Sequence, residues 1–404
     1  MKKALAVLLV LAMAFTLFAC AADNGGGDGA QPPPAQAPAA QAPAAQAPGV
    51  GDPQLVVADH VPEGGDTIGF VTDDVDHWAR PEYHIVYFNF NPTGVTGQIA
   101  LALEQLGEVW NFRVTQLTAN NDSDAFITTL QTILIGGDID GLIVDITDEL
   151  ATRASEILRD FGIPAVSVFN AAADFDGNML IPSVIMDQFL NGWTQVNHTY
   201  SVHRDIWGDV DGSEIALLVV DHSTNMALHQ RYLGARAAFL EFFPNNAHLI
   251  FYGDTGAEGL GAESGFAHAN AILSANPQIQ HWFAVGTVED NALGMARAIE
   301  ALGMDDRVLL TSSGAGILPS QWDEGYVGAW IANYSIPPFL YSGVAIFGLI
   351  AMIDGRATMD TLWPDMFLPG DLAARFVLEA EMMTRENYVE YIANFMRQFG
   401  VDPA

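Results

Sequence analysis

Short apolar runs alternate with longer amphipathic stretches from about residue 84 to residue 311. The short runs are bounded by turn residues and predict strands, whereas the longer stretches carry apolar residues at helical spacing and predict helices. Strands that alternate with helices form parallel sheets with helices on both faces. The predicted strands are 84–90, 112–117, 141–145, 165–169, 215–220, 249–252, 282–285 and 308–311, and the predicted helices are 97–106, 124–135, 150–161, 188–202, 226–242, 262–275 and 292–302.

This pattern falls into two similar series, one ending near Met186 and the other beginning after it. The chain from residue 54 onward has about 350 residues, which is more than one hydrophobic core normally serves. We therefore predict two α/β lobes, each built on a doubly wound parallel sheet. Ligands of open α/β sheets bind beyond the carboxyl ends of the strands, so we expect a site in the cleft where two such edges face each other.

The first residues of the chain predict export rather than structure. Residues 1–20 carry Lys2 and Lys3 before an apolar run that is too short to span a bilayer comfortably, as in a signal peptide. Its end, Leu-Phe-Ala-Cys, resembles a bacterial lipobox and implies lipidation of Cys20. The protein is then expected at the outer face of the cytoplasmic membrane, in the cell envelope or periplasm. Cys20 is the only cysteine, which excludes disulfides, thiolate metal sites and thiol catalysis.

Residues 21–53 are Gly-rich and then repeat Ala-Pro-Gln-Ala, with no apolar periodicity from which a core could form. We predict a disordered linker that tethers the folded part to its anchor. The formal net charge of −34 disfavours nucleic acid and anionic lipid surfaces as partners. The lipid anchor is therefore the only membrane contact that we expect.

Three segments of the chain resemble a known protein family. The stretch from Asn276 to Gly286, followed by Asp-Asn-Ala-Leu-Gly at 290–294, resembles the type I periplasmic sugar-binding proteins of ABC transporters, most closely the arabinose-binding group. Residues 383–388 and the Arg-x-x-Gly of 231–234 match the same family. The resemblance implies a type I periplasmic binding protein fold, with two Rossmann-like lobes joined by a hinge that the chain crosses three times.

By matched position, the resemblance also implies lobe boundaries. Lobe one would hold residues 54–186 plus 334–375, and lobe two residues 187–333 plus 376–404. Its further implications are a monomer that binds a small sugar, needs no cofactor and no metal, and has an ABC transporter permease as partner.

Sugar recognition needs fixed hydrogen-bonding groups for hydroxyls and flat apolar surfaces for ring faces. Arg231 is the strongest candidate, because its planar charged fork can donate two hydrogen bonds at once. The ligand-binding residues carried over from the family are Phe90, Asn91, Phe169, Asn170, Asp187, Arg231, Glu289, Asp290, Ser313 and Asn333.

Each candidate also has a structural interpretation. Arg231 could pair with a nearby acid on the surface, and Phe169 could pack in the core. Asp187 could equally cap the helix that begins there, and Glu289 with Asp290 would favour a helix N-terminus without any ligand. The chain departs from the arabinose-binding pattern at Phe169-Asn170, where the family has acids, and this favours a different sugar, deoxygenated or with an apolar substituent.

The expected function is capture of a monosaccharide for an ABC transporter. A receptor that presents its ligand-bound form to a membrane sensor kinase or chemoreceptor would share the fold, and the sequence does not separate the two. An enzyme is disfavoured, because the ten histidines show no metal-ligand spacing and no Gly-x-Ser-x-Gly turn occurs. Residues 209–214 resemble a calcium loop but lack its distal glutamate, so a plain turn is favoured.

Overall fold

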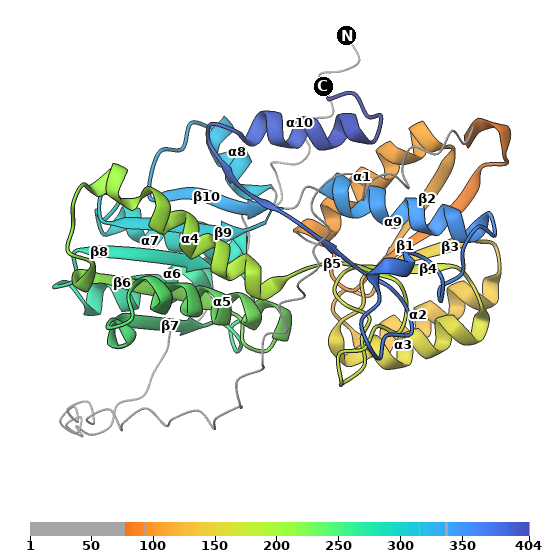
Figure 1. Cartoon of the computed structure of the whole chain (residues 1–404), viewed down its shortest axis with the longest axis horizontal. Helices are drawn as coiled ribbons and strands as arrows, with labels where there is room; N and C mark the ends of the chain where they lie inside the picture. The colour runs from red at the N-terminus through yellow and green to blue at the C-terminus, as the bar shows by residue number, and fades with distance from the viewer. Residues whose placement is uncertain (1–76, 93, 315, 336–337, 404) are drawn as a thin grey trace, which may run out of the picture. The chain divides into compact units, whose positions relative to one another are not determined.

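The computed structural model describes residues 77–92, 94–314, 316–335 and 338–403. The predicted signal peptide, the linker and Cys20 lie outside the described residues, as does most of the segment 54–83. The described chain contains two six-stranded sheets, each flanked by helices on both faces (Figure 1).

The first sheet has the strand order β11-β5-β4-β3-β1-β2, and all of its paired strands are parallel. Its central strands are buried on both faces, which explains why they read as continuous apolar runs. The elements of this lobe are η1 (His77–Ala79), β1 (Tyr83–Asn89), α1 (Val95–Trp110), β2 (Phe112–Thr118), α2 (Ser123–Gly136), β3 (Gly141–Val144), α3 (Asp148–Phe161), β4 (Ala165–Phe169), β5 (Ser183–Met186), α9 (Pro338–Ile353), η4 (Pro364–Met366) and β11 (Arg375–Leu378).

Two hydrophobic clusters cover the faces of this sheet. Helices α1 and α9 pack on one face, where Leu103 and Ile346 are fully buried. Helices α2 and α3 pack on the other face, where Phe126 and Leu158 are fully buried. Helix α9 is buried on nearly all sides, so it has no polar stripe. No helix within the described ranges is both long and apolar enough to cross a membrane.

The second sheet has the order β12-β10-β9-β8-β6-β7 and is parallel except for the edge strand β12, which runs antiparallel to β10. Helices α4 and α5 cover one face, and α6, α7 and α8 cover the other. The elements of this lobe are α4 (Gln188–Trp207), η2 (Gly212–Glu214), β6 (Ile215–Asp221), α5 (Met226–Phe242), η3 (Ala247–Leu249), β7 (Ile250–Asp254), α6 (Ala262–Ala275), β8 (His281–Gly286), α7 (Glu289–Ala301), β9 (Val308–Ser313), α8 (Ile317–Asp323), β10 (Trp330–Ser335), β12 (Glu381–Thr384) and α10 (Tyr388–Gln398).

The chain passes between the two sheets three times, from β5 to α4, from β10 to α9 and from β11 to β12. The predicted fold class, two doubly wound α/β lobes, is confirmed. The individual predicted strands and helices also correspond to elements of the structure, with ends that differ by a few residues. Elements that the hydrophobic pattern did not predict are β5, α8, β10, α9, β11, β12 and α10.

Candidate ligand-binding cleft

A cavity of about 950 Å³ lies where strand ends and loops of both sheets meet. This volume suits a small ligand, since ligand pockets usually span about 300–1,000 Å³. Many lining residues end a strand or directly follow one, as the rule for open α/β sheets requires. The cavity is lined by eight of the ten predicted residues, namely Phe90, Asn91, Phe169, Asn170, Arg231, Glu289, Asp290 and Ser313.

Asp187 and Asn333 do not line this cavity. The Asp187 side chain accepts a hydrogen bond of 2.8 Å from the backbone N–H of Leu190 and thereby caps α4. Asn333 is fully buried, and its Nδ2 donates to Glu289 Oε1 and to the carbonyl oxygen of Gly314, both at 2.8 Å. In this arrangement both residues stabilise elements beside the cleft.

Arg231 lies in the first turns of α5 and is only 2% exposed. Its Nε donates to Gln188 Oε1 at 2.7 Å, and its Nη1 donates to the carbonyl oxygen of Thr287 at 2.5 Å. Burial lowers the pKa of Arg231 to about 10, so the guanidinium remains charged at neutral pH. The two bonds leave the rest of the fork facing the cleft.

Two glycines bring α4 against α5 at this point. A Cβ atom on Gly192 would lie 1.7 Å from the carbonyl oxygen of Arg231, and one on Gly234 would lie 1.9 Å from the carbonyl oxygen of Phe189. Only glycine permits this backbone approach. The Arg-x-x-Gly sequence therefore joins a cleft side chain to the helix contact that positions it.

Glu289 begins α7 and is 7% exposed. Its carboxylate accepts hydrogen bonds from the backbone N–H groups of Gly316, Ile317 and Leu318 and from Asn333 Nδ2, at 2.8–3.1 Å. Although burial raises the pKa of Glu289, these backbone donors oppose the rise. Glu289 thus ties the start of α8 to β10 and fixes the floor of the cleft.

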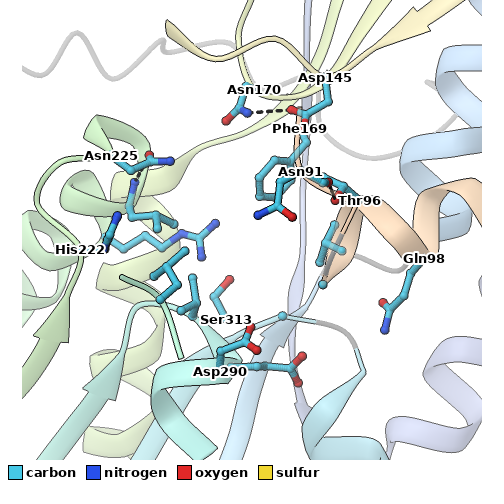
Figure 2. Close-up of a pocket in the computed structure, with 18 of the residues that line it drawn as sticks. Asn91, Thr96, Gln98, Asp145, Phe169, Asn170, His222, Asn225, Asp290 and Ser313 are labelled. Atoms are coloured by element: carbon cyan, nitrogen blue, oxygen red, sulfur yellow. Dashed lines mark hydrogen bonds between the residues drawn. The ribbon is translucent and has the colours of Figure 1, made fainter. Parts of the chain in front are cut away.

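Asp145 directly follows β3 and is 3% exposed. Its Oδ1 accepts a hydrogen bond of 2.7 Å from Asn170 Nδ2, the contact drawn in Figure 2. Burial raises the pKa of Asp145 to about 7, although the Asn170 bond opposes the rise. The cleft therefore holds a carboxyl group that changes charge near neutral pH.

Phe169 ends β4 with a left-handed backbone, at φ 71°. Such a φ is unusual for a bulky residue and is retained only where neighbouring contacts hold it. The Asn170 N–H donates to the Val168 carbonyl oxygen at 2.8 Å, and the Ser167 hydroxyl donates to the Asn170 carbonyl oxygen at 3.0 Å. This turn directs the Phe169 ring into the cleft (Figure 2). The ring lies edge-on to the ring of Tyr341, at a centroid distance of 6.1 Å.

Several lining residues were not among the predicted site residues. Asp145 and His222 each follow a strand of the sheet, so the rule that selected Phe90 could also have selected them. Tyr341 lies in α9, a helix that the sequence did not predict, and no local signal marks it. Gln98 of α1 also lines the cavity and carries no such local signal.

The geometry defines a class of protein: a two-lobe α/β protein with a cleft that is lined by polar side chains and aromatic rings. No family model and no curated protein matches the chain. Solved structures do match it. The three described next are covered over nearly their whole length.

A periplasmic solute-binding protein of an ABC transporter from Actinobacillus succinogenes 130z, with bound D-allose, is 16% identical with a TM-score of 0.59, over 77% of this chain and 100% of that one. An arabinose-binding protein from Geobacillus stearothermophilus is 17% identical with a TM-score of 0.59, over 77% and 99%. A transcription regulator of Lactococcus lactis is 17% identical with a TM-score of 0.55, over 76% and 98%.

The chain therefore has the type I periplasmic binding protein fold, and its structural neighbours include sugar-binding proteins of this type, arabinose-binding proteins among them. The predicted resemblance is confirmed at this level. Because a transcription regulator shares the fold, the fold alone does not establish what the cleft binds.

Proposed function

We propose that the protein is an extracytoplasmic solute-binding lipoprotein that captures a monosaccharide in its cleft and delivers it to an ABC transporter. It catalyses no reaction. The observation that carries this proposal is the cavity of about 950 Å³ to which both lobes contribute side chains. A ligand that contacts both lobes stabilises the conformation in which they enclose it, and this conformation is what a permease recognises.

The chemistry of the lining supports a hydroxylated ligand. Amide and hydroxyl groups of Asn91, Asn170 and Ser313 can donate and accept hydrogen bonds, and the ring of Phe169 offers a flat apolar surface. Among the described residues, no group of three or more His, Cys, Asp or Glu side chains could hold a metal ion. Two neighbours that carry sugar names, one with bound D-allose, point in the same direction.

The lipid anchor at Cys20 and the linker of residues 21–53 belong to the same proposal. Their role would be to hold the binding lobes beside a membrane transporter. Palmitate labelling of the protein in its host, with Cys20→Ser as the control variant, tests the anchor. Label that survives this substitution would contradict it.

Calorimetric titration with a monosaccharide panel tests the binding function, and solution scattering with and without the bound sugar tests lobe closure. We expect one sugar to bind and to reduce the radius of gyration. We also expect a sugar other than arabinose to bind most tightly, because Phe169 and Asn170 replace the acids expected there. Arabinose as the tightest ligand would overturn this second expectation.

The variant Arg231→Ala should weaken binding roughly tenfold or more, since hydrogen bonds from charged groups contribute about 1.5–3 kcal/mol. Arg236 lies exposed on the same helix and does not line the cavity. Its alanine variant is therefore the matched control and should bind normally. Equal binding by both variants would show that Arg231 does not contact the ligand.

A further inference from the structure

Three buried residues of the cleft lining carry a carboxyl or guanidinium group. Asp145 and Glu289 each carry a carboxyl group, and Arg231 carries the guanidinium. The two other carboxylates of the lining, Glu149 and Asp290, are exposed. Water screens exposed charges far more than buried ones. The electrostatic potential inside the cleft therefore depends mainly on these three buried groups.

Two of these three groups are already compensated. The Glu289 carboxylate accepts hydrogen bonds from three backbone N–H groups and from Asn333 Nδ2. The Asp145 carboxyl accepts from Asn170 Nδ2 at 2.7 Å and, with a pKa of about 7, is largely protonated in mildly acidic solution. Neither presents a fixed, unpaired negative charge to the ligand.

Arg231 differs, because it holds a permanent charge without a counterion. Its two hydrogen bonds go to neutral acceptors, the Gln188 amide and the Thr287 carbonyl. No carboxylate in the described part of the chain lies within ion-pair distance of it. Asp221, the one carboxylate among the groups that raise the pKa of Arg231, is fully buried and accepts hydrogen bonds from His229 Nδ1 at 2.8 Å and from the Tyr252 hydroxyl at 3.1 Å.

A buried charge without a partner is costly, and such groups in proteins are normally paired. The missing partner can be supplied by a ligand. Arg231 lines the cavity, as does Ser313. The remaining N–H groups of Arg231 thus present an unsatisfied cationic fork of the shape that binds a carboxylate through two parallel hydrogen bonds.

Two further donors line the same cavity. The Tyr341 hydroxyl is buried and has no hydrogen-bond partner among the described residues. Arg231 and Tyr341 lie near enough to influence each other, since the guanidinium opposes the rise that burial causes in the pKa of the phenol. Ser313 Oγ accepts a hydrogen bond of 2.8 Å from Asn191 Nδ2, which leaves its own proton available to a ligand.

We propose that the ligand is a sugar acid whose carboxylate binds Arg231, Tyr341 and Ser313, and that neutral monosaccharides are weaker ligands. This inference rests on the proposed function and specifies its ligand class. A carboxylate fits better than a phosphate group. Arg231 is the only Lys or Arg side chain among the described residues that line the cavity, and the exposed acids Glu149 and Asp290 would repel a dianion.

Calorimetric titration with matched pairs tests the inference: D-galacturonate against D-galactose, and D-glucuronate against D-glucose. We expect one acid to bind roughly tenfold or more tightly than its parent sugar, as loss of a charge-assisted hydrogen bond predicts. In Arg231→Gln this preference should vanish, because the acid should lose much more affinity than the neutral sugar does. Tyr341→Phe should weaken binding of the acid more than binding of the neutral sugar.

The matched control is Arg236→Gln on the exposed side of the same helix, and thermal melting shows that each variant is folded. A neutral sugar that binds more tightly than its acid, or an Arg231→Gln variant that loses both ligands equally, would overturn the inference and leave the proposed function intact. A folded protein that binds no member of the panel in either form would instead overturn the proposed function.

Discussion

At the scale of single residues, Asp145 makes the stability of the folded protein depend on pH. Burial raises the pKa of its carboxyl from 3.8 to about 7 in the folded protein. Between these two values the folded state keeps a proton that the unfolded state releases, so the contribution of Asp145 to stability falls as the pH rises through this window. Above about pH 7 the carboxyl is ionised in both states, and the loss is complete.

The variant Asp145→Asn should therefore stabilise the protein at pH 8 and have a smaller effect at pH 4. The difference is at most roughly 4 kcal/mol. Urea unfolding at both pH values measures it. Asp160→Asn, an exposed carboxylate on α3, is the control and should not alter the pH dependence. Equal effects of Asp145→Asn at both pH values would contradict the assignment.

At the scale of elements, the contact of α4 with α5 determines where Arg231 lies. A Cβ atom on Gly192 or Gly234 would overlap a backbone carbonyl oxygen at 1.7 or 1.9 Å, and backbone atoms cannot rotate away as a side chain can. Either alanine variant should force the helices apart, destabilise the protein by about 1–3 kcal/mol or more, and displace the guanidinium. Chemical unfolding and ligand titration measure the two effects.

Gly136, the last residue of α2, is the control for this pair. A Cβ atom there would meet nothing within 4 Å, so Gly136→Ala should leave stability unchanged or slightly raised. A Gly192→Ala variant with unchanged stability and unchanged ligand affinity would show that the close helix contact does not position Arg231.

At the scale of the whole molecule, α10 contacts the cores of both lobes. Near its start, the Tyr388 hydroxyl donates to Asp323 and the Tyr391 hydroxyl donates to the Ser335 carbonyl oxygen, both at 2.6 Å. Just beyond its end, Phe399 packs against Trp110 and Phe347, at centroid distances of 6.4 and 5.9 Å. The described C-terminus therefore ties the two lobes together.

The variant Phe399→Ala should cost about 3–5 kcal/mol, as removal of a buried phenylalanine usually does. It should also reduce the cooperativity of unfolding between the lobes, which differential scanning calorimetry detects as a broader or split transition. Val389→Ala is the control, because Val389 on the same helix is 64% exposed. A sharp transition at the original temperature in Phe399→Ala would refute this role.

Much of the fold could be predicted because parallel strands buried on both faces and amphipathic helices leave distinct periods in the sequence. Helix α9 could not be predicted in this way. It is surrounded by apolar neighbours on nearly all sides, so its residues show no polar stripe from which a helical period could be read. The short edge strand β11 pairs with β5 across about 190 residues of sequence, a contact that no local pattern encodes.

The cleft could be predicted in part, since residues after strand ends meet at one edge of a sheet. Local chemistry alone did not separate a ligand contact from a cap: Asp187 suited both, and in the structure it caps α4. The position of Asp145 after a strand could have marked it as a lining residue, but in so acidic a chain nothing in the sequence indicated the raised pKa of its carboxyl. Its raised pKa comes from burial, which only the fold produces.

The sequence by itself determined the class of fold and the end of the strands at which the cleft forms. Both follow from the hydrophobic periodicity and from the parallel direction of the strands. The tertiary structure alone decided which charges the cleft contains. Desolvation and hydrogen bonding depend on neighbours that are distant in sequence. These neighbours leave Arg231 as a buried cation near the hydroxyl of Tyr341, which has no hydrogen-bond partner in the part of the chain that the structure describes.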